Sequence, residues 1–152
     1  MRTFQDCEGR EWKLSVNLGS ARRVKEQYGI DLLGFDERLI GRLSSEMVLM
    51  ADVVFLLIEQ QAKGRDIDRE AFFDALDGTA LESAKDALID ATVDYLPAGR
   101  QEKVRKALAK IKELDDRLIA EAEKRLNDPN FIDGVIAELQ SKLLGPAKQP
   151  TA

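Results

Sequence analysis

Few side chains in this sequence are able to perform chemistry, and most of them are carboxylates. The chain has no histidine and a single cysteine, Cys7. It therefore offers neither a Cys–His zinc site nor a nucleophile activated by a neighbouring histidine. General acid–base catalysis needs a carboxylate whose surroundings shift its pKa, whereas the closely spaced carboxylates here lie on charged stretches that we expect to be solvated. We predict no catalytic residue, no bound cofactor and no metal site. The closely spaced pairs are Asp66 and Asp68, Asp86 and Asp90, and Asp115 and Asp116.

Charge and composition exclude further classes of function. The chain of 152 residues carries a net charge of −5, so general binding to nucleic-acid phosphates is disfavoured. A single cysteine permits no intrachain disulfide, which fits a reducing cytoplasm. The first residues contain no apolar run typical of a signal peptide. Hydrophobic residues make up 44% of the chain, aromatic residues 6%, and there are only four prolines; this composition favours long helices over many short strands.

The fold is predicted to be organised around residues 44–64. Apolar residues run from Val48 to Ile58 with Asp52 as the one interruption. A helix that is apolar nearly all round lies in a protein core or in lipid, and about 20 apolar residues are needed to span a bilayer. This run is shorter and contains a carboxylate. We therefore predict the central core helix of a soluble domain, with Val48 on its buried face, and no contact with a membrane.

Asp52 is the most unusual residue of this helix, because an unpaired carboxylate is costly in an apolar environment. One interpretation places it at the single solvated edge of the helix, in line with Glu59. The other pairs it with an arginine, such as Arg22, Arg23 or Arg42. We prefer the solvated edge.

A β-hairpin is predicted at the N-terminus. Trp12, Leu14, Val16 and Leu18 alternate with polar residues, which is the period of a half-buried strand. Thr3 to Cys7 is a weaker strand partner, and Gly9 can adopt the positive φ that a short hairpin loop requires. Two strands alone are marginally stable, so we expect the hairpin to pack on helices.

The remaining pattern predicts helices punctuated by glycine, proline and capping residues. We expect Ser44 or Ser45 to cap the core helix and Gly64 to end it in a left-handed conformation. We also expect Gly29 to end the helix over 19–28, Asp68 to cap the helix over 69–76, and Thr79 with Glu82 to form a capping box. The fold class is thus mainly α with a small N-terminal hairpin. We predict a domain over 1–97, a helical extension over 98–145 and a disordered tail over 146–152. The further helices are predicted over 19–28, 35–43, 69–76, 80–96, 101–127 and 130–144.

The helical extension carries a narrow apolar stripe on an otherwise charged helix. Such a stripe suits a partner helix or one face of the domain equally well. The last helix repeats this amphipathic pattern, and in both helices the apolar positions are the candidate partner-binding residues. They are Val104, Ile111, Leu114 and Leu118 in the long helix, and Ile132, Ile136 and Leu139 in the last one.

A set of short motifs covers roughly the first two-thirds of the chain. It begins with T-F-x-D-x-x-G-R-x-W-x-L-x-V over Thr3–Val16, and it includes F-x-x-A-L-x-G-x-A-L-E-x-A over Phe72–Ala84. Between and after these segments lie R-V-K at Arg23–Lys25, G-x-D-L-L at Gly29–Leu33, E-Q-Q-A at the end of the core helix, and Y-L-P at Tyr95–Pro97. Taken together, the pattern resembles the tail assembly chaperones of long-tailed, siphovirus-type bacteriophages.

The resemblance implies a small, non-enzymatic protein in the cytoplasm of the infected bacterial host. It implies binding to the tape measure protein, a very long helical polypeptide that stays soluble and extended while tail tube subunits assemble around it. It also implies absence from the mature virion, and no catalytic residue is carried over. Self-association and contact with tail tube subunits are further expected interactions of such an oligomeric viral protein.

Two other classes stay open at this point. A structural tail or connector subunit of a virion would share the hairpin-plus-helices build, and it would be found in mature particles. A small helical regulatory protein associated with nucleic acid would use the basic residues of the long helix, although neighbouring carboxylates dilute their field. Those basic residues are Arg100, Lys103, Arg105, Lys106, Lys110 and Lys112.

Overall fold

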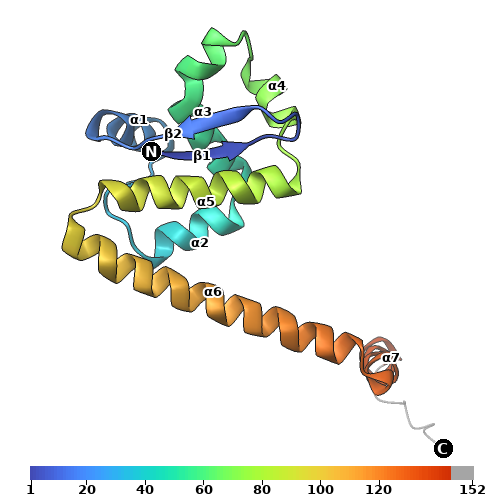
Figure 1. The fold of residues 1–152 in the computed structure, drawn as a ribbon. Helices are drawn as coiled ribbons and strands as arrows, with labels where there is room; N and C mark the ends of the chain where they lie inside the picture. The colour runs from blue at the N-terminus through green and yellow to red at the C-terminus, as the bar shows by residue number, and fades with distance from the viewer. Residues whose placement is uncertain (145–152) are drawn as a thin grey trace, which may run out of the picture. The chain divides into compact units, whose positions relative to one another are not determined.

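The computed structural model describes residues 1–144, over which the chain forms one β-hairpin and seven helices (Figure 1). This confirms the predicted fold class. The chain divides into a compact unit, Met1–Arg105, and a second unit that begins at Lys106. The predicted tail over 146–152 lies outside the described residues. The helices are α1 Leu18–Tyr28, α2 Glu37–Ser45, α3 Met47–Gly64, α4 Arg69–Asp74, α5 Gly78–Tyr95, α6 Ala98–Leu126 and α7 Pro129–Leu144.

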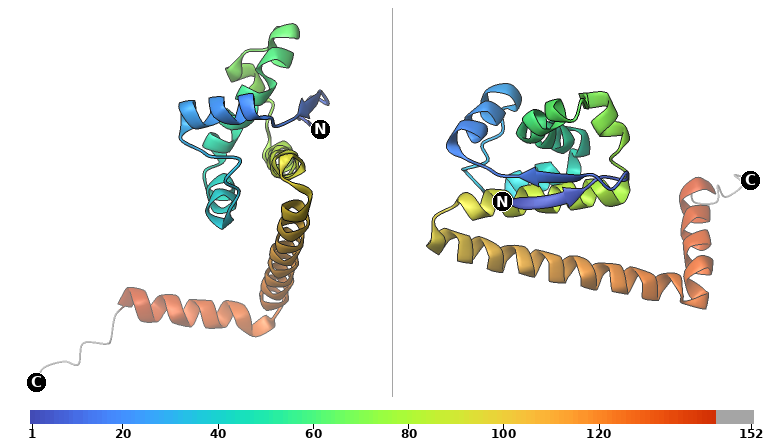
Figure 2. Two further views of the ribbon diagram at one scale, coloured as in Figure 1. Left: turned by 90° about the vertical axis from the view of Figure 1, so that its left-hand side faces the viewer. Right: turned by 45° about the horizontal axis from the view of Figure 1, so that its top comes forward.

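The predicted hairpin is confirmed, with shorter strands than the alternation suggests. β1 (Arg2–Gln5) pairs antiparallel with β2 (Glu11–Leu14), and Gly9 in the loop has φ +78°. β2 stops before Val16 because Asn17 already caps α1 by accepting from Ser20 N–H. β1 packs on α5 and β2 on α3 (Figures 1 and 2), so the helices supply the burial that two strands lack on their own.

The core of the first unit is centred on aromatic rings brought together from four elements. Phe72 of α4 lies with its ring centroid 5.4 Å from Trp12, 5.5 Å from Phe55 and 6.4 Å from Phe4. Edge-on and tilted ring pairs at such distances stabilise a core beyond the area that they bury. The four side chains are all buried, so α4, although short, is held firmly against α3 and the hairpin.

α3 is the core helix that the apolar run predicts, but its ends differ from the prediction. Ser44 and Ser45 belong to α2, and Glu46 precedes α3 without a side-chain capping bond. Gly64 is the last helical residue, and the positive-φ glycines of the described chain are Gly9 and Gly29. The first turn of α3 also departs from the prediction, because Val48 is 72% exposed.

Carboxylates cap three helices of the first unit at their N-termini. Asp36, Asp68 and Asp77 each accept a hydrogen bond from the backbone N–H three residues on, at the starts of α2, α4 and α5. The predicted capping box of Thr79 and Glu82 is therefore wrong, because Asp77 starts α5 two residues earlier. At the C-terminal end of α1, Gly29 ends the helix with φ +68°, as the sequence predicts.

Candidate functional site

The residues predicted to bind a partner lie on α6 and α7, and both helices are largely exposed. Along α6, Ile111, Leu114 and Leu118 are exposed members of the second unit, whereas Val104 belongs to the first unit and is half-buried. On α7, the predicted residues are all exposed. The structure places the two sets on separate helices that do not pack against each other within the described residues, so they form two apolar faces. The exposed α7 residues are Ile132, Ile136 and Leu139.

Both apolar faces are larger than the predicted residue set. Ile119 and Leu126 extend the α6 face, and Val135 and Leu143 extend that of α7. The spacing rule that found the first residues follows strict heptads, whereas Ile119 and Leu126 lie one position to the side of that seam. A periodicity of 3.6 residues rather than 3.5 would have included them. Exposed apolar residues that follow one another along a helix are typical of a surface that meets another protein.

Local ion pairs stabilise these exposed helices. Arg117 donates to Glu113 at 2.6 Å, Arg125 to Glu121 at 3.1 Å, and Lys142 lies 3.0 Å from Glu138. Each pair joins residues four apart, an arrangement that contributes about 0.2–0.5 kcal/mol to an exposed helix. The charged side chains thus support helix formation without covering the apolar faces.

The start of α6 is held to the first unit through Asp94. The Arg2 guanidinium donates to both Asp94 carboxylate oxygens, at 2.8 and 3.0 Å, and Arg105 donates to one of them at 2.5 Å. The hydrogen bonds from Arg2 hold the pKa of Asp94 below its ordinary value despite partial burial. Gln101 adds hydrogen bonds to the carbonyls of Asp94 and Leu96. The first two turns of α6 therefore belong to the compact unit.

The most deeply buried carboxylate of the described chain is Asp6, which sequence reasoning did not single out. Its side chain accepts from Arg10 Nε at 2.8 Å, from Trp12 Nε1 at 2.9 Å and from the backbone N–H groups of Glu8 and Arg10 at 3.0 Å. Burial raises the pKa of Asp6, but the hydrogen bonds from Arg10 and Trp12 outweigh burial and lower it overall. A carboxylate with all its acceptor positions used in this way fixes the hairpin loop. The spacing D-x-x-x-R-x-W is the local signal that would have found it.

Asp52 lies in an ion pair rather than alone at a solvated edge. Arg69 Nη1 is 2.7 Å from Asp52 Oδ1, and the Arg69 guanidinium also lies over the ring of Phe55. The Asp52 side chain is 22% exposed. The preferred interpretation is therefore wrong in part, because the partly solvated carboxylate has an arginine partner. The alternative of an ion pair with an arginine is confirmed, although Arg69 is not one of the three arginines named as examples.

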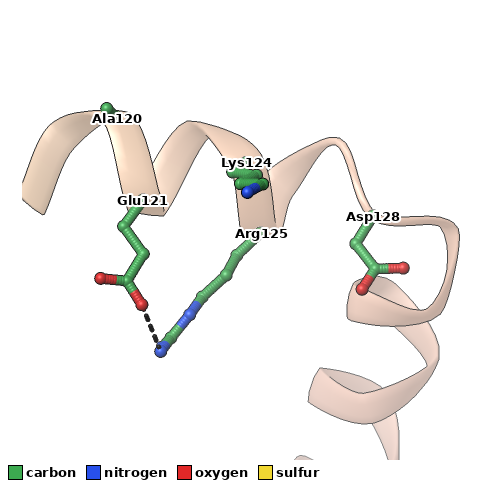
Figure 3. Close-up of a pocket in the computed structure, with 5 residues that line it drawn as sticks. All are labelled: Ala120, Glu121, Lys124, Arg125 and Asp128. Atoms are coloured by element: carbon green, nitrogen blue, oxygen red, sulfur yellow. Dashed lines mark hydrogen bonds and ion pairs between the residues drawn. The ribbon is translucent and has the colours of Figure 1, made fainter. Parts of the chain in front are cut away.

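The closely spaced carboxylates do not converge on any enclosed site. Five of the six are exposed and Asp90 is half-buried. Over residues 1–144, no group of three or more carboxylate or cysteine side chains is arranged to hold a metal ion. A shallow hollow at the turn between α6 and α7 is lined by Ala120, Glu121, Lys124, Arg125 and Asp128, all exposed, and contains the Glu121–Arg125 ion pair (Figure 3). Its mixed charges point to no particular ligand.

A second hollow, on the first unit, is apolar throughout. It lies between the first turn of α3, the end of α4 and the start of α5. The sequence predicts Val48 on the buried face of the core helix, whereas the structure leaves it exposed. Phe73, Leu76 and Leu81 are half-buried. The residues that line it are Met47, Val48, Ala51, Phe73, Leu76 and Leu81.

Within the described residues, none of the helices has the length and apolar content to cross a membrane. Comparisons with protein-family models, with curated proteins and with solved structures find no match for this chain.

Proposed function

We propose that this chain is a tail assembly chaperone of long-tailed bacteriophages, which binds the tape measure protein and keeps it soluble during tail assembly. The motif pattern over the first two-thirds of the chain supports the assignment to this class. The single observation that carries the binding role is the pair of exposed apolar faces on α6 and α7. Among the residues predicted to bind a partner, the most exposed on each helix are Leu118 of α6 at 64% and Ile132 of α7 at 62%.

A chaperone for a long amphipathic helix needs apolar surface that is available before the client arrives. Helix-in-groove recognition supplies such contacts through apolar residues repeated every three or four positions. α6 and α7 present this spacing on solvent-exposed helices. In this proposal the chain acts in the cytoplasm of the infected host, further copies and tail tube subunits are additional partners, and the mature virion lacks it.

Co-expression with the tape measure protein of the same genome tests the proposal. The wild-type chain should shift that client from the insoluble to the soluble fraction. A double variant with Leu118→Glu and Ile136→Glu should abolish the shift, because it places a charge in each apolar face. A double variant with Ala120→Glu and Ser141→Glu is the matched control, since it adds the same charges at exposed positions outside those faces. A client that is equally insoluble with and without the wild-type chain would overturn the proposal.

Analysis of purified phage particles separates the chaperone from a structural tail or connector subunit. A chaperone that leaves before maturation should be undetectable in mature particles by mass spectrometry, while tail tube subunits from the same sample are detected. Finding the chain in those particles in fixed proportion to the tube subunits would favour the structural role instead.

A further inference from the structure

The apolar hollow of the first unit has the size of one large side chain. Its volume is about 160 Å³, and the six residues that line it have apolar side chains. A dry apolar cavity of about 150 Å³ accepts a benzene molecule, so one Phe, Leu or Met side chain fits here. Since the lining offers no polar side chain, the hollow selects an apolar group rather than a polar ligand.

The hollow is open in a unit that otherwise covers its large apolar residues well. Val48, at its mouth, is 72% exposed, and the other exposed large apolar side chains within residues 1–105 are Met1, Leu18 and Tyr95. The residues that line the hollow lie in α3, α4 and α5 and, for Leu76, in the short connection between α4 and α5. A partner therefore meets side chains rather than an open strand edge, which favours a helical partner over an added strand.

The surroundings of the hollow are acidic. Each chain segment that lines it carries a carboxylate next to a lining residue. Lys85 pairs with Glu82, and Arg42 pairs with Glu46, while Asp74 and Asp77 form no ion pair in the described part of the chain. The surplus negative charge favours a partner with basic side chains beside its apolar group. The four carboxylates are Glu46, Asp74, Asp77 and Glu82.

We propose that this hollow binds one large apolar side chain of an amphipathic helix in another protein, with lysine or arginine flanking that side chain. The apolar anchor fills the space beside Val48, and the basic flanks face Asp74 and Asp77. Assigning this helix to the client rests on the proposed function, whereas the binding chemistry does not. The hollow would then give the chaperone a contact that is specific for the sequence of the partner helix, in addition to the apolar faces of α6 and α7.

Fluorescence anisotropy with the full-length chain tests this binding chemistry. The probe is a fluorescein-labelled synthetic helix of about 18 residues, or roughly five turns, made of Ala and Lys, with one Phe at the centre of its apolar face as its single large apolar side chain. The same peptide with Ala in place of Phe should bind more weakly by about tenfold to a hundredfold, as expected for burial of one Phe side chain. A peptide with Glu in place of every Lys should also bind more weakly, and its disadvantage should shrink at high salt.

Matched variants locate the binding. Val48→Lys should weaken binding of the Phe peptide by about tenfold or more, so that the Phe peptide no longer binds more tightly than the Ala peptide. Leu18→Lys makes the same change at a similarly exposed position, 65% against 72%, and should retain the tighter binding of the Phe peptide. Asp74→Asn should weaken binding of the original peptide, which carries both Phe and Lys, by a few-fold relative to Asp116→Asn on α6. Trp12 fluorescence checks that each variant is folded.

Several outcomes would overturn the proposal. One is equal binding of the Phe and Ala peptides. Another is an equal effect of Val48→Lys and Leu18→Lys on peptide binding, and a third is binding of the Glu peptide that is as tight as that of the Lys peptide. If Val48→Lys instead dissociates an oligomer in sedimentation while peptide binding is unchanged, the hollow holds a second copy of the chain. If the client stays insoluble on co-expression while the peptide results are as expected, the chaperone function is refuted and the binding by the hollow is not. If the client becomes soluble but Val48→Lys does not change peptide binding, the binding by the hollow is refuted and the chaperone function is not.

Discussion

Replacing Asp6 with asparagine is the most informative single perturbation of the hairpin, because the two side chains have the same shape. Asp6 Oδ2 accepts from Arg10 Nε and from Trp12 Nε1, while Oδ1 accepts from two backbone N–H groups of the loop. An amide has one oxygen and one NH₂ group. In either orientation of the new amide, two donors that meet an oxygen in the wild type would face the NH₂ group instead.

The expected cost follows from the burial of those donors. Trp12 is fully buried, and leaving a buried donor without an acceptor costs about 1–3 kcal/mol. The Arg10 side chain is 28% exposed, so it can turn to water and contribute about 1 kcal/mol more. We expect Asp6→Asn to lower the free energy of unfolding by about 2–4 kcal/mol, a large share of the roughly 5–15 kcal/mol that is typical of a domain.

Urea unfolding followed by the fluorescence of the only tryptophan, Trp12, measures this effect where it arises. The matched control is Asp86→Asn, which removes the same charge from an exposed position on α5 and should change stability by less than about 0.5 kcal/mol. If Asp6→Asn were as stable as Asp86→Asn, the carboxylate would not be fixing the loop through its hydrogen bonds, and our account of the hairpin would be wrong.

The pH dependence gives the same carboxylate an independent test. The folded-state pKa of Asp6 lies below its ordinary value, so its contribution to stability is present above the unfolded-state pKa of about 3.9. That contribution is lost as the pH falls through the folded-state pKa. The difference in stability between the wild type and Asp6→Asn should therefore be full at neutral pH and should shrink below about pH 4. A difference that stays constant to lower pH would refute the assignment.

Three further predictions test a helix end, the α3 ion pair and the limit of the first unit, all by urea unfolding. Gly29→Ala should cost about 1–2 kcal/mol because φ is +68°, whereas Gly41→Ala, inside α2 with open space around it, should stabilise by about 0.5–1 kcal/mol; the reverse order would contradict this. Asp52→Leu should cost about 1 kcal/mol or less because its ion pair is partly exposed, and a loss of several kcal/mol would indicate a buried pair. A chain ending at Arg105 should unfold at higher urea than one ending at Pro97, which lacks the first turns of α6 and their hydrogen bonds; equal midpoints would place the domain limit at residue 97.

The parts of the fold that follow from local chemistry could be predicted from the sequence. The hairpin alternation, the left-handed Gly29 and the Asp68 cap each depend on a few neighbouring residues, and the structure has all of them. The start of α5 shows the limit of this reasoning. Two capping patterns overlap there, and Asp77 prevails over Thr79 by accepting from Ala80 N–H at 2.8 Å. Both patterns satisfy the same local rule, so spacing alone does not choose between them.

What could not be predicted depends on how helices are placed against one another. α3 is apolar nearly all round, so its periodicity does not say which side the neighbouring helices leave uncovered, and Val48 was assigned to the wrong side. The partner of Asp52 is 17 residues away on α4, which makes the pair a result of tertiary packing. The apolar hollow has the same origin, because its lining comes from three helices and from the connection between α4 and α5. The α6 and α7 faces were easier to predict, since each lies along a single helix.

In the proposed function, client binding and self-association would compete if both used the α6 face. Such competition can be distinguished from binding of copies side by side through the dependence of client occupancy on concentration. If a second copy covers Leu114 and Leu118, raising the total concentration above the dissociation constant of the dimer removes free surface by mass action. The concentration of free monomer would then rise only as the square root of the total concentration, so occupancy of the client would rise less steeply than in proportion to the chain added. If copies instead bind side by side along a long client, each bound copy leaves its neighbours' faces available, and occupancy rises to saturation. Because α7 carries its own exposed face, Leu118→Glu alone should remove self-association in the first case while leaving part of the client binding in place.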